Sequence, residues 1–451
     1  MAGPPPVLRR AARRRRPRTA VRTVHHRRTT VMPRPAAGAV AALCSALLLT
    51  SACTGDPVAN PRATVSIGFL APLSGPAATV GADTRRGAEL AVKIVNEDLT
   101  SIPLPLGPGE GLLRANRTKI RLLTADTAAS GTTVAGQVER LVRGRGAVAV
   151  AGGYESAVTQ AAAARAEALK VPLVNGGSSA ASLTERGLDW FFRTGPSDLG
   201  YGRVVFSLLK EQRQSEGTAV RRIAVVHTDD QYGSDGSDMI KRLASQVDGD
   251  VVADVEVSAG STDLSGAVEK VRASDPDVVL TLLYTPQALA LSDESRAVSY
   301  EPPALVAFGG GYADPAFVTT EGRDAEGICS RFAWSADLAT HNRAARAVAG
   351  LYRATYHRPM NDDAARAFTA VMSLAQAVGE ATSLSPADIR SALVNLDVPG
   401  RDTIMPWDGV KFDDNHQNIG ARGVVEQIQK GGYRLVYPFD VARARLRWPM
   451  P

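Results

Sequence analysis

The sequence predicts an α/β protein with two doubly wound parallel-sheet lobes. From residue 64 onward, short runs rich in β-branched residues alternate with longer amphipathic runs. This alternation is typical of a parallel sheet flanked by helices. It restarts after Gly195 and Pro196, which indicates two blocks. The 451 residues, 44% of them hydrophobic and 22% charged, suffice for two such lobes.

The first block is expected to form four strands and three helices. The strands are predicted at residues 64–73, 119–126, 147–153 and 171–177, and the helices at 82–99, 132–144 and 156–170. The Pro- and Gly-rich segment 101–117 interrupts the block, and we expect it to be an exposed loop.

The second block repeats the pattern. Helices are predicted at 199–213, 235–247 and 263–274, and strands at 221–229, 250–258 and 277–284. After Trp334 the chain becomes mainly helical, with helices expected at 341–357, 362–382 and 385–396, and Ser385 is a suitable N-cap for the last of them. Residues 423–439 predict two strands joined at Gly431 and Gly432.

The N-terminal leader carries the positive charge of the chain. The sequence has 52 Lys and Arg and 46 Asp and Glu, and 11 of the arginines lie between Arg9 and Arg34, where there is no acid or lysine. The remaining 41 basic residues are fewer than the 46 acidic ones. The basicity therefore belongs to the leader, and we expect no nucleic-acid partner.

Residues 1–53 are predicted to be a signal peptide with a lipobox. Arg34 precedes the apolar stretch Ala36 to Leu49, which suits a secretory signal and is too short to span a bilayer. The start codon can be Met1 or Met32, since both leaders export the chain.

The residues "TSAC" that end at Cys53 resemble a bacterial lipobox, in which the leader is cut before an acylated cysteine. Ordinary signal cleavage nearby is the alternative. A lipidated Cys53 would anchor the protein to the outer face of the cell membrane, and residues 54–62 would form a polar tether of about 30 Å. Cys44 leaves with the leader, so Cys329 remains as a free thiol without an assigned role.

The carboxyl ends of the predicted strands carry the candidate binding residues. In open parallel sheets ligands bind outside these ends. Here the ends are "AGGYES", which contains Tyr154 and Ser156, and "NGGSSA", which contains Gly177, Ser178 and Ser179, followed by "HTDDQYG", "LLYTP" and "AFGGGY". The glycines let a ligand approach the backbone. The serines lie where helices begin, a place suited to a carboxylate, although plain N-capping is the alternative for each.

Four motifs occur in this order along the chain: "IGFLAPLSGPAATVGADTRRGAELAV", "LTERG…FFRT", "DDQYG" and "DAEGI". With these motifs the chain resembles, over roughly residues 64–438, the type I periplasmic binding proteins, in particular the branched-chain amino-acid (leucine/isoleucine/valine) binding family of ABC importers. The resemblance implies two lobes joined by a three-crossover hinge, with the ligand in the cleft. We expect lobe 1 to comprise residues 63–195 and 330–418, and lobe 2 residues 196–329 and 419–451.

The resemblance also implies roles for individual residues. The carboxylate-binding serine of the family falls on Ser156, and its Ala-x-Thr element falls on Gly177 to Ser179. Its ligand-contacting tyrosines fall on Tyr232 and Tyr284. A tyrosine offers an apolar ring and a hydroxyl, which suits a small ligand with one polar end. A structural role at the rim is the alternative for each tyrosine.

Two positions depart from the family pattern. The glutamate that pairs with the ligand's α-ammonium becomes Gly310, and the first-lobe aromatic becomes Val80. A buried ammonium without a partner is costly. Either another acid, such as Glu155, Asp230 or Asp314, replaces the glutamate, or the ligand is not an α-amino acid.

The expected function is capture of a small polar, carboxylate-bearing solute by an extracytoplasmic lipoprotein that delivers it to an ABC permease. A ligand sensor that signals to a membrane partner is the alternative. No set of nucleophile, base and orienting residue is visible, so we do not expect an enzyme. We expect no cofactor and no metal, and we expect a monomer.

Overall fold

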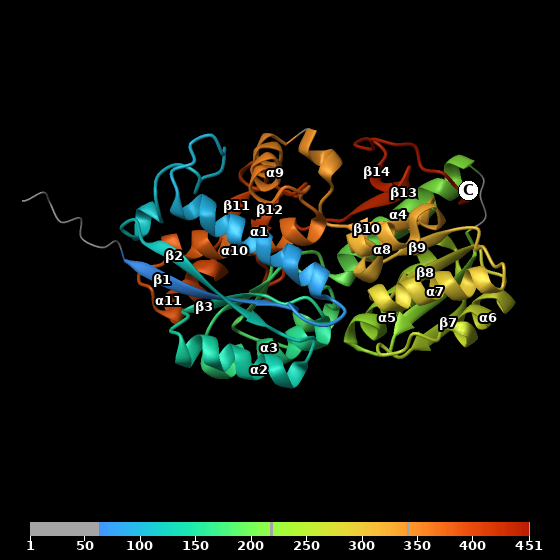
Figure 1. The fold of residues 1–451 in the computed structure, drawn as a ribbon, viewed down its shortest axis with the longest axis horizontal. Coiled ribbons are helices and arrows are strands. Elements are labelled where there is room, and N and C mark those ends of the chain that lie inside the picture. Colours follow the sequence, from blue (N-terminus) through green and yellow to red (C-terminus); the bar gives the residue numbers. More distant parts are fainter. Residues whose placement is uncertain (1–62, 217–219, 341, 451) are drawn as a thin grey trace, which may run out of the picture. The chain divides into compact units, whose positions relative to one another are not determined.

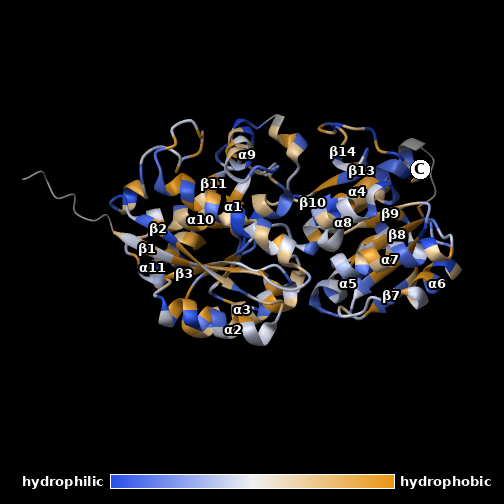
Figure 2. Cartoon of the chain, in the orientation of Figure 1, coloured by the Kyte–Doolittle hydropathy of each residue, from blue (hydrophilic) through white to orange (hydrophobic). Residues whose placement is uncertain are grey.

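The structure is a computed structural model that describes residues 63–216, 220–340 and 342–450. It contains two main β-sheets, each with helices on both faces (Figure 1). Hydrophobic residues concentrate in the strands and on the helix faces that cover them (Figure 2). The predicted α/β class with parallel-sheet lobes is confirmed. The predicted signal peptide and tether lie outside the described residues.

The first sheet has five strands, all parallel, in the order β2-β1-β3-β4-β5. These strands are β1 (Thr64–Ala71), β2 (Lys119–Asp126), β3 (Ala149–Gly152), β4 (Leu173–Asn175) and β5 (Phe191–Arg193). The helices that cover it are α1 (Ala78–Asn96), α2 (Gly131–Glu139), α3 (Ser156–Leu169) and α10 (Asp362–Glu380). Ile67 and Phe69 of β1 lie in the core with α1 and α10, whereas Leu70 lies in the core with α2 and α3. This alternation follows from the two-residue period of a strand.

The second sheet has seven strands in the order β14-β13-β10-β9-β8-β6-β7. These strands are β6 (Arg222–Thr228), β7 (Asp250–Val257), β8 (Val278–Leu282), β9 (Leu305–Ala307), β10 (Cys329–Phe332), β13 (Val424–Gln429) and β14 (Gly432–Tyr437). The first five strands of this list pair in parallel, and β13 and β14 are antiparallel.

Five helices cover the second sheet. They are α4 (Asp198–Glu216), α5 (Gln231–Ala244), α6 (Ser265–Ala273), α7 (Thr285–Ala297) and α8 (Pro315–Glu321). Ile223 and Val225 of β6 lie in the core with α4 and α5, and Ala224 and Val226 lie in the core with α6, α7 and α8. Each face of the sheet is therefore closed by its own set of helices.

The remaining elements lie between β10 and β13 in the chain. They are α9 (Arg343–Tyr356), α11 (Pro386–Val394) and the hairpin of β11 (Asp397–Pro399) and β12 (Gly409–Lys411). The Ser385 hydroxyl accepts a hydrogen bond from the backbone N–H of Asp388 at 3.2 Å, which confirms the predicted N-cap of α11.

The chain passes between the two sheets three times, from β5 to α4, after β10, and from β12 to β13. The first and third connections run side by side, because Arg193 N–H donates to His416 O and Asn418 N–H donates to Arg193 O, both at 2.9 Å. Phe332 at the end of β10 pairs with Val424 at the start of β13. We propose that these adjacent connections are the hinge, and we retain the predicted limits of the two lobes as a proposal.

The prediction for residues 101–117 needs a correction. Apart from the short 3-10 helix η1 (Leu113–Ala115), the segment is a loop, but Ile102, Leu104 and Leu112 are buried in the same core as α1 and α10. The Pro- and Gly-rich composition indicated the absence of regular structure and gave no signal for these three apolar anchors.

None of the helices in the described residues is long and apolar enough to cross a membrane.

Candidate functional site

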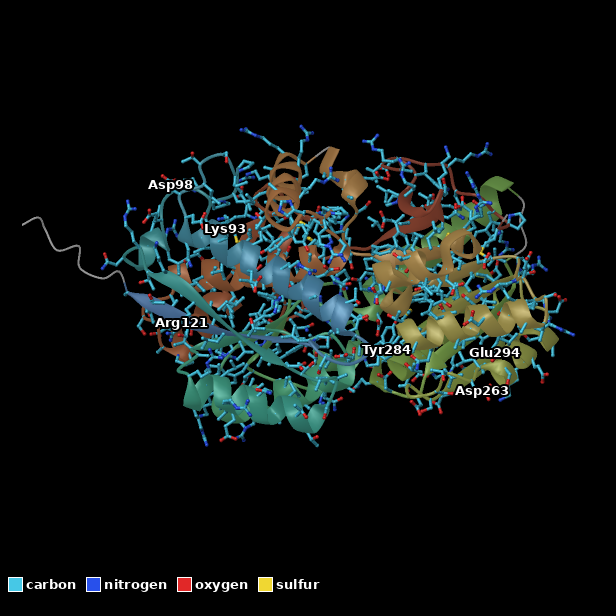
Figure 3. The ribbon with its side chains drawn as sticks, in the orientation of Figure 1. Lys93, Asp98, Arg121, Asp263, Tyr284 and Glu294 are labelled. Atoms are coloured by element: carbon cyan, nitrogen blue, oxygen red, sulfur yellow. The ribbon has the colours of Figure 1, made fainter. Side chains whose placement is uncertain are left out.

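A small pocket lies where residues from both sheets converge, with a volume of about 290 Å³ that includes its open mouth. It is lined by Tyr154, Ser156, Gly177, Ser179, Tyr232, Tyr284, Gly310, Arg331 and Arg366. Six of the seven predicted ligand-binding residues are among them, and Ser178 is not. In Figure 3, Tyr284 lies between the ribbons of the first and second sheets.

The loop after β3 places Tyr154 and Ser156 at the pocket. Gly152 and Gly153 have positive φ angles of 103° and 94°. A Cβ on Gly152 would lie 2.2 Å from the carbonyl oxygen of Leu70, so only glycine allows this tight turn. Ser156 then opens α3, and no side chain caps the first turn of this helix. Its free N–H groups are therefore available to an anion in the pocket.

The loop after β4 supplies Gly177 and Ser179. Asn175 holds this loop in place, because its side-chain amide donates to the carbonyl oxygens of Gly152 and Gly153 at 2.9 and 3.0 Å. The hydroxyl of Ser178 bonds to Thr159 Oγ1 at 2.6 Å and donates to the carbonyl oxygen of Tyr154 at 3.0 Å. Ser178 thus joins the two loops behind the pocket.

The second sheet contributes two of the three tyrosines. Tyr232 of α5 donates its hydroxyl to the carbonyl oxygen of Phe308 at 2.9 Å, and Tyr284, just after β8, donates to Asp230 Oδ2 at 2.7 Å. The Tyr284 ring lies 5.4 Å from that of Tyr232 and 6.3 Å from that of Tyr154. Burial raises the pKa of Tyr154 and Tyr284 well above the usual value, so both phenols are neutral.

Two arginines that the sequence reading did not single out complete the pocket. Arg366 of α10 forms ion pairs with Asp362, at 2.8 Å, and with Asp363, and it donates to the carbonyl oxygen of Gly177 at 2.5 Å. Arg331 of β10 donates to Ser179 Oγ at 3.2 Å and stacks over the Tyr201 ring at 3.6 Å. The available signal was an arginine in an otherwise apolar strand or on the apolar face of a helix, a position where charge is rare.

The three acids considered as ammonium partners do not line the pocket. Asp230 caps α5 and accepts from Gly233 N–H, the Thr228 hydroxyl and the Tyr284 hydroxyl. Asp314 caps α8 and accepts from the Thr285 hydroxyl at 2.8 Å. Both carboxylates are therefore engaged in structural hydrogen bonds.

Glu155 differs from these two acids because neither of its buried carboxylate oxygens has a hydrogen-bond partner. Burial raises the pKa of Glu155 to about 7, and the charges of Asp230 and Asp126 add to the effect. Of the two positions that depart from the family pattern, Gly310 lines the pocket, and Val80 is buried in α1.

Contacts between the two sheet systems surround the pocket. Ser182, in the short helix η3 (Ala181–Leu183), donates its N–H and hydroxyl to Asp235 Oδ2 of α5 at 3.0 and 2.5 Å. The Gln231 side chain also donates to the Ser182 hydroxyl, and the N–H of Asp198 donates to Ser179 O at 2.7 Å. These hydrogen bonds join the two sheet systems next to Ser179 and Tyr232, which line the pocket.

A larger pocket, of about 1640 Å³ including its open mouth, lies beside α6 and α7, and Met450 is among the residues that line it. Of its charged lining residues, Arg296 pairs with Asp324 and with Glu321, and Glu326 pairs with Arg447. Tyr300, whose buried hydroxyl has no hydrogen-bond partner, also lines this cavity. The described residues also contain no group of three or more His, Cys, Asp or Glu that could hold a metal ion.

Comparison with known proteins adds to this geometry. The model of a family described as "Periplasmic binding protein" matches residues 64–432. "Leu/Ile/Val-binding protein homolog 8" of Brucella abortus is 27% identical over 397 residues, which cover 86% of this chain and 93% of the relative.

Solved structures share the fold. The branched-chain amino acid transporter substrate binding protein LivJ from Streptococcus pneumoniae, in complex with isoleucine, has a TM-score of 0.69 and 23% identity, and the match covers 83% of this chain and all of LivJ. A solute binding protein from R. palustris in complex with benzoate has a TM-score of 0.67 and 18% identity, with 83% of this chain and 95% of that protein covered.

Proposed function

The chain belongs to the periplasmic binding proteins, in the type I branch of the branched-chain amino-acid ABC transporter family, and from this membership we propose that it captures a small carboxylate-bearing solute and delivers it to an ABC importer. The family consists of solute-binding proteins and not of enzymes, and its members act outside the cytoplasm.

The observation that carries this proposal is the composition of the pocket. Ser156 and Ser179 lie at the uncapped start of α3 and in the loop after β4, so hydroxyl and N–H groups face one end of a ligand. Tyr232 and Tyr284 face it from the second sheet. Hydrogen-bond donors at one end and aromatic rings at the other suit a carboxylate with a short apolar body.

The mechanism that we propose is a shift between open and closed forms. A ligand that contacts both sheet systems stabilises the closed form, because only that form offers all contacts together. A permease that recognises the closed form then receives loaded protein in preference to empty protein. Ligands found in relatives, isoleucine and benzoate, are both small carboxylates.

We further propose that the protein is a lipoprotein, acylated at Cys53, which lies outside the described residues. Support comes from the "TSAC" segment after an apolar stretch and from the polar residues 54–62 that follow it. Such an anchor would keep the protein beside its permease at the membrane surface.

A thermal-shift screen of the purified protein tests the binding proposal. The panel contains amino acids, organic acids and amides. Binding to the native state alone stabilises by about 2.7 kcal/mol when the ligand concentration is one hundred times Kd, so a true ligand raises the melting temperature in a concentration-dependent manner. A panel without any such shift would contradict the proposed function.

A further inference from the structure

The charges that line the pocket are of one sign. Among its nine lining residues are two arginines, Arg331 and Arg366, and no aspartate or glutamate. A ligand with an ammonium group would therefore face guanidinium groups without a carboxylate to pair with it. Placing like charges together and desolvating an unpaired ammonium are both unfavourable.

The two arginines differ in how their charge is compensated. Arg366 is neutralised by Asp362 and Asp363. Arg331 is 4% exposed and forms no ion pair with any carboxylate of the described residues, and its Nε has no hydrogen-bond partner. Its Nη2 donates to Ser179 Oγ, which itself lines the pocket. Burial raises the pKa of the Asp198 carboxyl to about 6, and the charge of Arg331 partly offsets this rise, so Asp198 is a nearby buried acid that neither lines the pocket nor forms an ion pair with Arg331. A buried guanidinium without a direct ion pair is costly, and an anion in the pocket would reduce this cost.

Glycines after β9 make the space that the Arg331 guanidinium occupies. Gly309 has a φ of +79°, and a Cβ there would lie 2.8 Å from Arg331 Cζ. A Cβ on Gly310 would lie 2.3 Å from the carbonyl oxygen of Leu283 and 3.0 Å from Tyr232 Oη. The loop therefore excludes every side chain, acidic ones included, from the position next to the guanidinium.

Nearby acids do not restore a negative lining. The oxygens of Glu155 and Asp198 are fully buried, and neither residue lines the pocket. Asp230 also lies outside the lining and is engaged by three hydrogen bonds. The ligand thus meets positive charge and neutral hydroxyls.

We infer that the solute is a small carboxylate without an α-ammonium group, and that Arg331, together with Ser179 and Ser156, binds its carboxylate and determines this specificity. The inference rests on the proposed function, because it names the class of solute that the same pocket takes. Deaminated and α-keto acids, and aromatic acids of similar size, belong to this class.

Isothermal titration of the wild-type protein with matched pairs of ligands tests the inference. Leucine and phenylalanine are each compared with the α-keto acid and the deaminated acid of the same side chain, and benzoate is added as an aromatic acid. We expect at least one acid without an ammonium group to bind, and to bind 10-fold or more tightly than its amino-acid counterpart. Equal or tighter binding of the amino acids would overturn the inference and leave the proposed function intact.

Variants of Arg331 provide a second test of the inference. Arg331→Met removes a charge-assisted contact, so we expect binding of the acid to weaken about 10- to 100-fold. Arg331→Lys keeps the charge and should weaken binding less. Arg422→Met is the control, since Arg422 is exposed and pairs with Asp408 away from the pocket; it should leave affinity unchanged.

Folding of each variant is checked by circular dichroism, because Arg331 also stacks on Tyr201. If Arg331→Met does not fold, two measurements still test the inference. They are the comparison of matched ligands on the wild-type protein and the affinity of Arg331→Lys. Unchanged affinity in a folded Arg331→Met would overturn the role of Arg331. If the only solutes that bind in the wider screen lack a carboxylate, the inference fails while solute binding stands.

Discussion

At the scale of single residues, Glu155 and Arg331 are opposite charges buried close to the same pocket, and neither forms an ion pair in the described part of the chain. Arg331 faces the pocket, where an anion can approach it. Glu155 is sealed from it, with both oxygens buried and without partners. We therefore expect Arg331 to bind an anionic ligand and Glu155 to bind a proton.

Glu155→Gln is expected to remove a pH dependence of stability. Burial raises the pKa of Glu155 to about 7 in the folded state, whereas an unfolded glutamate titrates near 4.3. At a pH below the pKa of the unfolded state, Glu155 is protonated in both the folded and the unfolded protein. Its contribution to the free energy of unfolding is greatest in this range. As the pH rises from about 4.5 to 7 only the unfolded state releases its proton, and stability falls by up to about 3 kcal/mol.

The measurement is urea denaturation at pH 5 and pH 8. At pH 8 the Glu155→Gln variant should be more stable than wild type by about 2 kcal/mol, and at pH 5 the two should differ far less. Glu269→Gln, which changes an exposed glutamate of α6, serves as the control and should show no such difference. A wild-type protein equally stable at both values would show that Glu155 does not carry this proton.

At the scale of elements, the contact between η3 and α5 joins the first sheet system to the second. Asp235 accepts two hydrogen bonds from Ser182, and Gln231 donates to the same serine. None of these residues lines the pocket. In the proposed mechanism these hydrogen bonds would stabilise the closed form without touching the ligand, so they would change affinity only through the balance of open and closed forms.

Asp235→Ala is therefore expected to weaken ligand binding about 5- to 10-fold. Loss of these hydrogen bonds costs the closed form about 1 kcal/mol, and the observed affinity falls with the population of that form. Titration calorimetry measures the affinity, and small-angle scattering should show a larger radius of gyration for the empty variant. The control, Asp238→Ala, changes an exposed residue one turn away on the same helix, and an effect as large as that of Asp235→Ala would refute this explanation.

Most elements could be predicted because each strand or helix shows its own period in the sequence. Boundaries were less accurate: α1 begins at Ala78 instead of residue 82, and α5 at Gln231 instead of residue 235. Helices α7 and α8 were not predicted, and the short strands β5, β10, β11 and β12 were missed, since three or four residues show no period. The buried loop residues Ile102 and Leu104 were missed for a related reason, because their neighbours in the core come from distant elements.

The candidate site could be predicted where it depends on strand ends. Tyr154, Ser156 and Ser179 follow strands of one parallel sheet, whose carboxyl ends must meet at one edge. Arg331 and Arg366 were missed because a strand of the second sheet and a late helix bring them there. Only tertiary packing shows that they face the same pocket.

At the scale of the whole molecule, the proposed mechanism depends on three connections between the sheets and on the proposed lipid anchor. Arg193, His416 and Asn418 hold two of the connections side by side through backbone hydrogen bonds. Small changes of backbone angles in such neighbouring connections suffice for a rotation of one lobe against the other. The proposed anchor would keep this movement close to the membrane.

The anchor itself is tested with Cys53→Ala in a bacterial host that expresses the full chain. We expect the variant to lose incorporation of a labelled fatty acid and to leave the membrane fraction, because acyl chains supply the membrane affinity. Cys329→Ala is the matched control and should keep both properties. A Cys53→Ala protein that is still labelled would contradict lipidation at this residue.

The thiol of Cys329 has a practical consequence. It is 1% exposed, and burial raises its pKa to about 12, so at neutral pH it is protonated and shielded from electrophiles. A maleimide dye added to the folded protein therefore meets no reactive sulfur in the described residues. One cysteine introduced at the exposed Asp238 could therefore be labelled without competition from Cys329, which would attach the protein to a surface or a probe at a position away from its pocket.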